Sequence, residues 1–497
     1  MRSPPLLLLV VLACSSNKRK EAPPTPAPRP ASEVAEAPPP ATPLIPLAAD
    51  PGGATGNARW TLALGGAGVD APRAVATEPG GAALLAGLFS GEATFGSLGA
   101  RAAAGKTDAV VVRVDERGAP SWVVPIGGAG EDVANGVAIL GDRILAVGSF
   151  SDKIAIASSD GDAPLVSKAE GSDDLFAACL DRRGVPQWLW RAGGRDSDGA
   201  NTVAAVADGW IIGGSFSGTA QFGATELVSR GRTDAVLLKL DTDGNLVWIK
   251  QFGGRYADAI WRVAADPAGD LLVQGVFADV SEWGGGPLKA GGGSDNDVVL
   301  AKYDHAGNHR WSQRFGNAFN EVAGGLAVDP AGFVTMTGSF DLKIDFGDGE
   351  VSSLGESDIF VARFAPDGKL VWKHTFGDKR EDIGFGVAAD AAGNVVVSGW
   401  FEGTVDFGGG PRTSSGNRDV FLLKLAPDGR HVWSTSFGAR DHDQARALAM
   451  DDQARPVLAG IFRFDVAVAP SASELHSTRA PDDKAPPPDI FLAAFER

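Results

Sequence analysis

The chain has 497 residues, 66 of them glycine, and a formal net charge of −17 at neutral pH. Such a length exceeds one ordinary domain, unless the chain is a repeat array or a large closed all-β fold. The abundant glycine and the lack of a long amphipathic helical pattern favour turns and strands. The negative charge argues against nucleic acid as a partner, because phosphate binding requires a basic patch.

The N-terminus reads MRSPPLLLLVVLAC, with an apolar run from Leu6 to Ala13 directly before Cys14. The run is too short to span a bilayer and predicts a cleaved targeting segment. VLAC resembles the lipobox of bacterial lipoproteins, which implies a signal peptide over residues 1–13 and lipid attachment to the Cys14 thiol. An ordinary secretory signal followed by a chance cysteine is the alternative. Ser15, in place of the Asp of the inner-membrane retention rule, favours the outer membrane or cell surface of a Gram-negative bacterium.

Residues 14–57 are rich in Pro and Ala, as in EAPPTPAPRPASEVAEAPPPATPLIP. A segment of this composition cannot bury a core and tends to an extended polyproline conformation. We expect a disordered, semi-rigid stalk that holds a folded head, residues 58–497, away from the membrane. The N-terminal lipid is then the membrane contact of the protein.

The remaining chain repeats one phrase, as in SDIFVARFAPDGKLVWKHTFG and RDVFLLKLAPDGRHVWSTSFG about sixty residues later. A tryptophan marks each copy and is followed by Gly five positions on, an acid ten positions on and Ala sixteen positions on. The tryptophans are Trp60, Trp122, Trp188, Trp248, Trp311, Trp372 and Trp433. No marker is missing, so the chain carries seven copies.

Two sets of acids recur with the tryptophans. The acids ten positions after each Trp are Asp70, Asp132, Asp198, Asp258, Glu321, Asp382 and Asp443. Later in each copy, after a Gly-x-Phe, an Asp opens an apolar strand; these are Asp108, Asp174, Asp234, Asp297, Asp358, Asp419 and Asp489.

Each copy holds four strand candidates. In the sixth copy they read FGVAAD, NVVVSGWF, DVFLLKL and HVWSTSFG, with the turn signals DAAG and APDG inside the first and last pairs. A four-stranded meander cannot bury both of its faces alone, and such units repeated radially make a β-propeller. We therefore predict an all-β, seven-bladed propeller of four-stranded blades over residues 58–497.

The wording of the copies resembles the bacterial cell-surface β-propeller repeats known as SBBP repeats, with their G-N-V-x-V-x-G, D-x-F-x-x-K and W/Y-x-x-x-x-G-G phrases. The resemblance extends from Trp60 to Arg497 and departs in copies two and seven, whose middle segments are longer. It implies a surface lipoprotein with a propeller head.

The chain ends predict how the ring closes. Only eight residues follow Asp489, so the last copy lacks its outermost strand. The head begins at NARWTLALGG, an outermost strand without partners. We predict that this N-terminal strand joins the last blade, which removes two exposed strand edges.

The interval from the Gly-x-Phe glycine to the strand-opening Asp varies between copies. It is 20, 21 or 22 residues in five copies, 26 in copy two (Gly148 to Asp174) and 29 in copy seven (Gly460 to Asp489). Variable loops on a rigid frame are where binding usually occurs, although neutral tolerance of an insertion explains the variation equally well.

The ring of acids ten positions after each Trp should lie on the same face as these loops, near the starts of the innermost strands. Seven carboxylates could bind a cation or a basic ligand. Because every copy keeps them, we interpret them as structural acceptors for loop N–H groups.

Signatures of a hydrolase are missing: the sequence has no G-x-S-x-G elbow and no H-E-x-x-H motif. Calcium is conceivable at DFGDGE or DTDGN, but neither offers a full set of ligands, so we expect no cofactor. The acids concerned are Asp345, Asp348 and Glu350 in the first segment and Asp241 and Asp243 in the second.

Two functions remain open. The first is a non-enzymatic, monomeric surface lipoprotein whose propeller binds a protein or a glycan at its loop-rich face. The alternative is a secreted or periplasmic propeller enzyme, a glycan lyase or hydrolase. Its site would use unrepeated charges such as Arg195 with Asp196, or Arg380 with Glu381.

Overall fold

The computed structural model describes residues 56–157, 164–292, 295–317, 319–468, 474–477 and 487–497. Within these residues the chain is built from β-strands, and the one helical element is a short 3-10 turn, η2 (Gly96–Leu98). No helix in this part of the chain has the length and apolar character that crossing a membrane requires. The predicted all-β class is confirmed.

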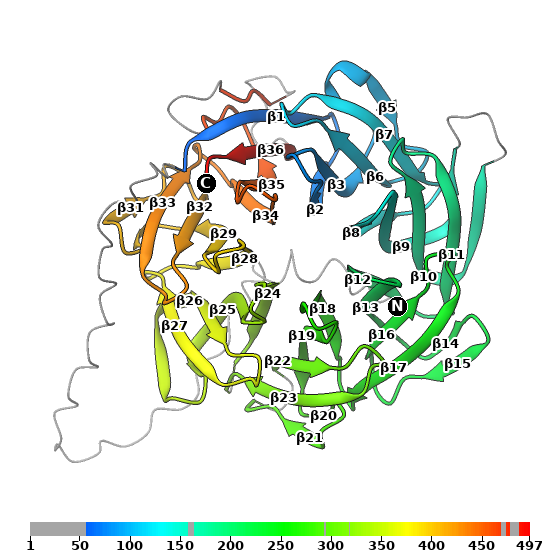
Figure 1. Cartoon of the computed structure of the whole chain (residues 1–497). Helices are drawn as coiled ribbons and strands as arrows, with labels where there is room; N and C mark the ends of the chain where they lie inside the picture. The colour runs from blue at the N-terminus through cyan, green and yellow to red at the C-terminus, as the bar shows by residue number, and fades with distance from the viewer. Residues whose placement is uncertain (1–55, 158–163, 293–294, 318, 469–473, 478–486) are drawn as a thin grey trace, which may run out of the picture. The chain divides into compact units, whose positions relative to one another are not determined.

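The strands form four-stranded antiparallel units that follow one another around a central axis (Figure 1). Unit one holds β2 (Ala71–Thr77), β3 (Ala83–Phe89), β6 (Asp108–Val114) and β7 (Pro120–Gly127); unit two holds β8 (Asp132–Leu140), β9 (Arg143–Ile156), β10 (Leu165–Asp181) and β11 (Pro186–Gly194). Unit three holds β12 (Gly199–Val206), β13 (Gly209–Phe216), β16 (Asp234–Leu240) and β17 (Leu246–Gly254).

Unit four holds β18 (Ala259–Ala265), β19 (Leu271–Ala278), β22 (Asn296–Tyr303) and β23 (His309–Phe315); unit five holds β24 (Glu321–Val328), β25 (Val334–Asp345), β26 (Glu350–Phe364) and β27 (Leu370–Phe376). Unit six holds β28 (Ile383–Ala389), β29 (Val395–Phe401), β32 (Asp419–Leu425) and β33 (His431–Phe437). Unit seven holds β34 (Gln444–Met450), β35 (Pro456–Phe462), β36 (Asp489–Phe495) and β1 (Ala58–Gly66). The four strands predicted in the sixth copy are thus present.

The hydrophobic core lies between neighbouring units. In β6, Val110 and Val112 face a cluster shared with unit seven, whereas Val111 faces a cluster shared with unit two. The third strands read as continuous apolar runs because both of their faces are covered. The first strand of each unit packs on the first strand of the next, and β34 of unit seven packs on β2 of unit one. The series of packed innermost strands therefore returns to its start (Figure 1).

The predicted pairing of the first strand of the head with the last strand of the chain is present. Leu62 of β1 pairs with Leu492 of β36, and the Glu496 N–H donates to the Asn57 carbonyl at 2.9 Å. Gly56, at a φ of +59°, lies against the Trp433 ring. In the other units this place is taken by the glycine of the hairpin turn between the third and fourth strands, as Gly429 lies against Trp372.

The variable interval between the second and third strands was predicted to be a loop, and this prediction is wrong. In units one, three, four and six it forms a small outer hairpin: β4 (Glu92–Thr94) with β5 (Ala100–Ala102), β14 (Thr219–Phe222) with β15 (Thr225–Val228), β20 (Val280–Glu282) with β21 (Pro287–Lys289), and β30 (Thr404–Asp406) with β31 (Pro411–Thr413). In units two and five the second and third strands themselves continue as a long hairpin. Strands of three or four residues are too short to show a period in the sequence.

The outer hairpins explain the second glycine of the Gly-Gly motif. The end of the outermost strand pairs with the hairpin of the following unit, as Gly194 of β11 pairs with Ala220 of β14. A Cβ atom at Gly194 would lie 2.0 Å from the Thr219 carbonyl oxygen, so only glycine permits this approach.

Later units replace this backbone contact with a side chain. The amide of Asn317, which follows the first glycine of its copy, donates to the Lys343 carbonyl. In the next copy the Thr404 N–H donates to the Asp378 carboxylate at 2.9 Å. These neighbouring units are therefore joined at this point either by paired backbone or by a hydrogen bond of a side chain.

Replacement of Gly194 by Ala should test this joint. We expect Gly194→Ala to lower the free energy of unfolding by about 1–3 kcal/mol, because the added methyl group displaces the hairpin backbone. Ala439→Gly, at the same position of another copy, is the matched control and should cost less than about 1 kcal/mol. Urea denaturation of both variants measures the difference, and equal losses would contradict the role assigned to the hairpin contact.

Candidate functional site

The ring of acids ten positions after each Trp lies at the starts of the innermost strands, and its members are at most 3 % exposed. Asp132 shows the arrangement. Its carboxylate accepts the Gly128 N–H at 2.8 Å, and its own N–H donates to the Thr107 carbonyl of the preceding unit at 3.0 Å. In the same way the Asp198 carboxylate accepts the Gly194 N–H, and the Asp198 N–H donates to the Asp173 carbonyl. These acids fasten the segments that connect one unit to the next.

These acids meet the strand-opening Asp of the preceding unit across the glycine that follows each Trp by five positions, as at Gly65, Gly193 and Gly316. A Cβ at Gly193 would lie within 3.0 Å of both the Asp174 and the Asp198 carboxylates, which explains why this position is glycine. Burial raises the pKa of Asp132 to about 7, and the neighbouring Asp108 charge adds to the shift.

The same cause acts around the ring. Burial raises the pKa of Asp198, Asp258 and Asp443 to about 7, that of Asp382 to about 8 and that of Glu321 to about 9. None of these acids lines the central cavity described below, and the hydrogen bonds of Asp132 and Asp198 are those of acceptors within the connecting segments.

The two acidic turns considered for calcium are hairpin turns. Asp345 accepts the Gly347 and Gly349 N–H groups at 2.8 and 3.0 Å, while Glu350 pairs with Lys343. Asp241 accepts the Asp243 N–H in the same way. Among the described residues no group of three acids, histidines or cysteines is placed to hold a metal ion.

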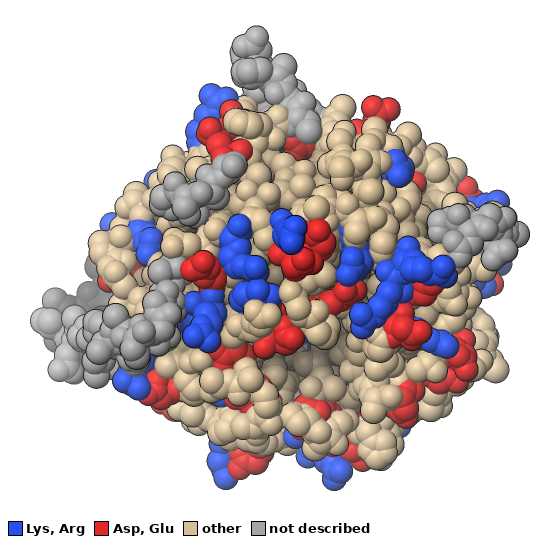
Figure 2. All heavy atoms as spheres, turned by 45° about the horizontal axis from the view of Figure 1, so that its top comes forward, with Lys and Arg blue, Asp and Glu red and all other residues tan. Residues whose placement is uncertain are grey.

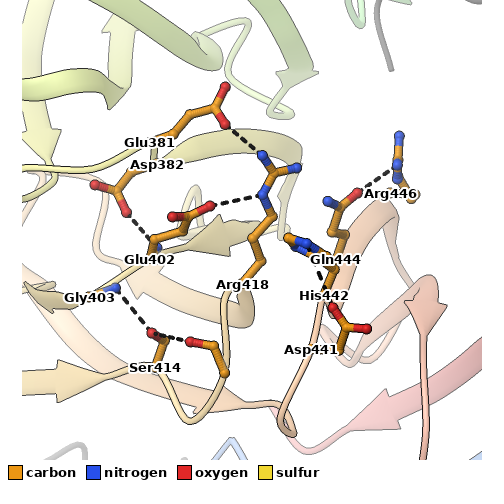
Figure 3. A network of polar contacts seen from close by, with 11 residues as sticks. Glu381, Asp382, Glu402, Gly403, Ser414, Arg418, Asp441, His442, Gln444 and Arg446 are labelled. Atoms are coloured by element: carbon orange, nitrogen blue, oxygen red, sulfur yellow. Dashed lines mark hydrogen bonds and ion pairs between the residues drawn. The ribbon is translucent and has the colours of Figure 1, made fainter. Parts of the chain in front are cut away.

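The charge pairs suggested for an enzyme are not assembled into a catalytic site. Arg195 and Asp196 are both exposed on a connecting segment. Glu381 binds Arg418 at 2.7 Å, and the same guanidinium binds Glu402 at 3.0 Å (Figure 3). Both carboxylates are held by the Arg418 cation, and Arg380, the predicted partner of Glu381, is exposed.

Arg418 belongs to a wider polar network on units six and seven (Figure 3). Its guanidinium carbon lies 3.9 Å from the centre of the Trp400 ring. His442 lies beside it, and burial together with the Arg418 charge lowers the pKa of His442. In β34, the Arg446 guanidinium donates to the Gln444 side chain at 2.6 Å.

The innermost strands carry a β-bulge at one repeated position, thirteen residues after each Trp. The register shifts there in every unit, and the bulge residues are Arg73, Asn135, Asn201, Trp261, Gly324, Phe385 and Arg446. Bulges redirect side chains and occur next to active sites. Most of these residues, with Arg262 beside Trp261, line a central cavity of about 150 Å³.

The residues of this site are not among those that all copies keep, so the repeat pattern does not indicate the site. The sequence does contain one signal for the site. The residue thirteen positions after each Trp changes in nearly every copy, although the residues around it recur. The cavity lining contains arginines, asparagines, one threonine and apolar residues, and no acid, histidine, lysine or cysteine. Such a set can bind an anion, and no residue of the lining is a usual general base for the threonine hydroxyl.

A second unrepeated feature lies in the segments that connect the units. Eight positions after the Trp, unit four is followed by Phe319 and unit three by Tyr256, where other copies carry small or charged residues. Phe319 is 43 % exposed, and Tyr256 lies 5.7 Å below the guanidinium groups of both Arg232 and Arg255.

Figure 2 shows a face of the molecule where basic and acidic side chains gather around a hollow.

Cys179 is the free cysteine of the described residues and is fully buried in β10. Burial raises the pKa of its thiol to about 12, so the thiol is unreactive, as the apolar strand pattern around it predicts.

Comparison with known proteins gives distant similarities. No family model matches the chain. The regulatory protein FlaEY of Caulobacter vibrioides is 27% identical over 176 residues, 34% of this chain and 18% of that protein. A WD repeat-containing protein of Acanthamoeba polyphaga mimivirus is 22% identical over 246 residues, 41% of this chain and 18% of that protein.

Among solved structures, the WD40 β-propeller domain of Doa1 aligns with a TM-score of 0.42 and 9% identity, over 89% of this chain and 97% of that chain. The Neurospora crassa Pan2 WD40 domain aligns with a TM-score of 0.40 and 8% identity, over 86% and 89%. Similarity at this level carries no information about a ligand or an activity.

The buried acids predict how stability depends on pH. The folded pKa of Asp132 is about 7, above the value of about 3.9 in an unfolded chain, so the folded state binds more protons between these values. We expect the free energy of unfolding to fall as the pH rises from 4 to 8. Asp132→Asn keeps an acceptor for Gly128 but cannot titrate, so its decline should be shallower.

Urea denaturation over this pH range measures both slopes. The exposed Asp196→Asn is the matched control and should follow the wild type. A slope for Asp132→Asn as steep as that of the wild type would contradict the shift assigned to this carboxyl group.

Proposed function

We propose that units one to seven are the blades of a closed seven-bladed β-propeller, with β1 as the outermost strand of the last blade. The pairing of β1 with β36 and the packing of β34 on β2 support this closure. So does Gly56, which supplies the turn glycine that unit seven otherwise lacks.

The propeller serves as a non-enzymatic binding head of an SBBP-type lipoprotein on the outer membrane or cell surface. Its anchor is Cys14, which lies outside the described residues, and its stalk is residues 14–57, of which only Gly56 and Asn57 are described. The VLAC motif and the Pro/Ala-rich composition support this arrangement. An enzymatic role is disfavoured by the lining of the central cavity and by the double pairing of Arg418.

The observation that carries the binding role is the unrepeated set of side chains around units three to five. Tyr256 and Phe319 occupy equivalent connecting segments, with Arg232 and Arg255 beside Tyr256. Tyrosine and arginine are the residues that dominate protein interfaces, so this set favours a protein over a glycan as the partner.

Leu342 adds to this set. It is 49 % exposed and has a φ of +58°, at a position where five other copies place Gly or Asp and copy seven places Phe464. A bulky residue in this conformation costs about 1–3 kcal/mol. Because the Leu342 side chain is exposed, packing within the protein does not offset the cost of its positive φ. Contact with a partner would offset it.

A photo-reactive benzoylphenylalanine tests the binding face. Placed at Phe319 of the full chain in cells, it should form a discrete covalent product with a protein. Val371, on the outermost strand of unit five and 46 % exposed, is the matched control and should form none. Equal products at both positions, or none at Phe319, would contradict a binding face here, and a carbohydrate-positive product would identify a glycan instead.

The anchor has a separate test. Labelling cells with an alkyne fatty acid should mark the wild-type chain, and Cys14→Ser should remove the label and release the protein from the membrane fraction. A Ser15→Thr variant keeps the thiol and should retain the label. Labelling that persists in Cys14→Ser would overturn lipid attachment at this residue.

A further inference from the structure

Three arginines line the central cavity, and no carboxylate lies there to balance them. Arg73 belongs to unit one, Arg262 to unit four and Arg446 to unit seven. Charges removed from bulk water are normally paired, because an unpaired buried charge loses several kcal/mol of hydration. All eighteen lining residues are described, and none is acidic.

The hydrogen bonds of these arginines confirm that their charge is not neutralised by the protein. Nε of Arg73 and Nε of Arg446 are buried without a hydrogen-bond partner. Arg446 donates to the neutral side chain of Gln444 and lies 5.6 Å from the centre of the Phe385 ring. Arg262 donates to the carbonyl of its neighbour Trp261 at 2.8 Å.

Arg73 also acts on Arg446. Burial, together with the charges of Arg73 and Arg418, lowers the pKa of Arg446 to about 9. Burial alone lowers the pKa of Arg262 to about 10. Both values lie above neutral pH, so both side chains keep their charge inside the cavity.

We infer that the central cavity is a binding site for an oxyanion, a phosphate or sulfate group held by Arg73, Arg262 and Arg446. A planar guanidinium donates two parallel hydrogen bonds to such a group, and charge-assisted bonds of this kind are about twice as strong as neutral ones. The cavity of about 150 Å³ admits a tetrahedral oxyanion with a few waters. The source is either a free ion or the terminal group of a larger ligand.

The oxyanion site in the cavity is independent of the partner proposed to bind at Phe319.

The full chain, purified in detergent, is titrated with sodium phosphate and sodium sulfate against sodium chloride at equal ionic strength. We expect both oxyanions to raise the midpoint of thermal unfolding above that in chloride. Calorimetric titration with phosphate should give one site per chain.

Substitutions separate the site from general charge effects. Arg446→Gln and Arg262→Gln should each weaken phosphate binding about tenfold or more, as the loss of a charge-assisted contact predicts. Arg117→Gln removes the charge of a side chain that is 85% exposed and should bind like the wild type. The two cavity variants lie in different units, so the test holds if one of them fails to fold.

Phenyl phosphate distinguishes the two sources of the anion. A shift equal to that of phosphate identifies the terminal group of a larger ligand, and no shift restricts the site to the free ion; either result keeps the oxyanion assignment. Phosphate and sulfate that stabilise no more than chloride would overturn it. Equal weakening in Arg117→Gln and Arg446→Gln would overturn it as well.

Discussion

The structure depends on burial between units, because a four-stranded sheet has two apolar faces and cannot cover either of them alone. Val110 and Val111, adjacent in β6, face cores shared with different neighbours. Displacement of one unit therefore exposes two cores. The residues that recur in all copies are the residues of these joints: the Trp ring on the turn glycine of the next unit, the glycine between two carboxylates, and the acid that fastens the connecting segment.

This constraint explains which features the sequence could predict. A joint that is repeated seven times leaves a periodic signal, so the strands and the strand pairing across the chain ends were accessible from tryptophan spacing. The outer hairpins were missed because strands such as Glu92–Thr94 are shorter than any readable period. The cavity was missed because its residues follow no period: a bulge places Arg73 and Phe385 at equivalent positions, and only their location in space connects them.

The two sets of buried charges differ in how the protein treats them. The acids accept backbone N–H groups, as Asp198 accepts that of Gly194, although one carboxylate oxygen of Asp132 and one of Asp258 are buried without a hydrogen-bond partner. Burial moves the pKa of several of these acids towards neutrality. The arginines keep their charge and have buried N–H groups without partners. A chain with a net charge of −17 therefore holds a central cavity whose lining carries only positive charge.

The asparagines at the bulge position make hydrogen bonds to the next unit. Asn135 donates to the Ala200 carbonyl at 3.0 Å and Asn201 to the Ile260 carbonyl at 2.9 Å, so each links its unit to the next at the centre of the ring. Asparagine at Arg73 or Arg446 would fit the same backbone geometry, remove a desolvated charge and supply the same kind of link. An oxyanion shared by arginines of different units restores that link through the ligand. If the cavity is occupied, the bound oxyanion joins the units that carry these arginines.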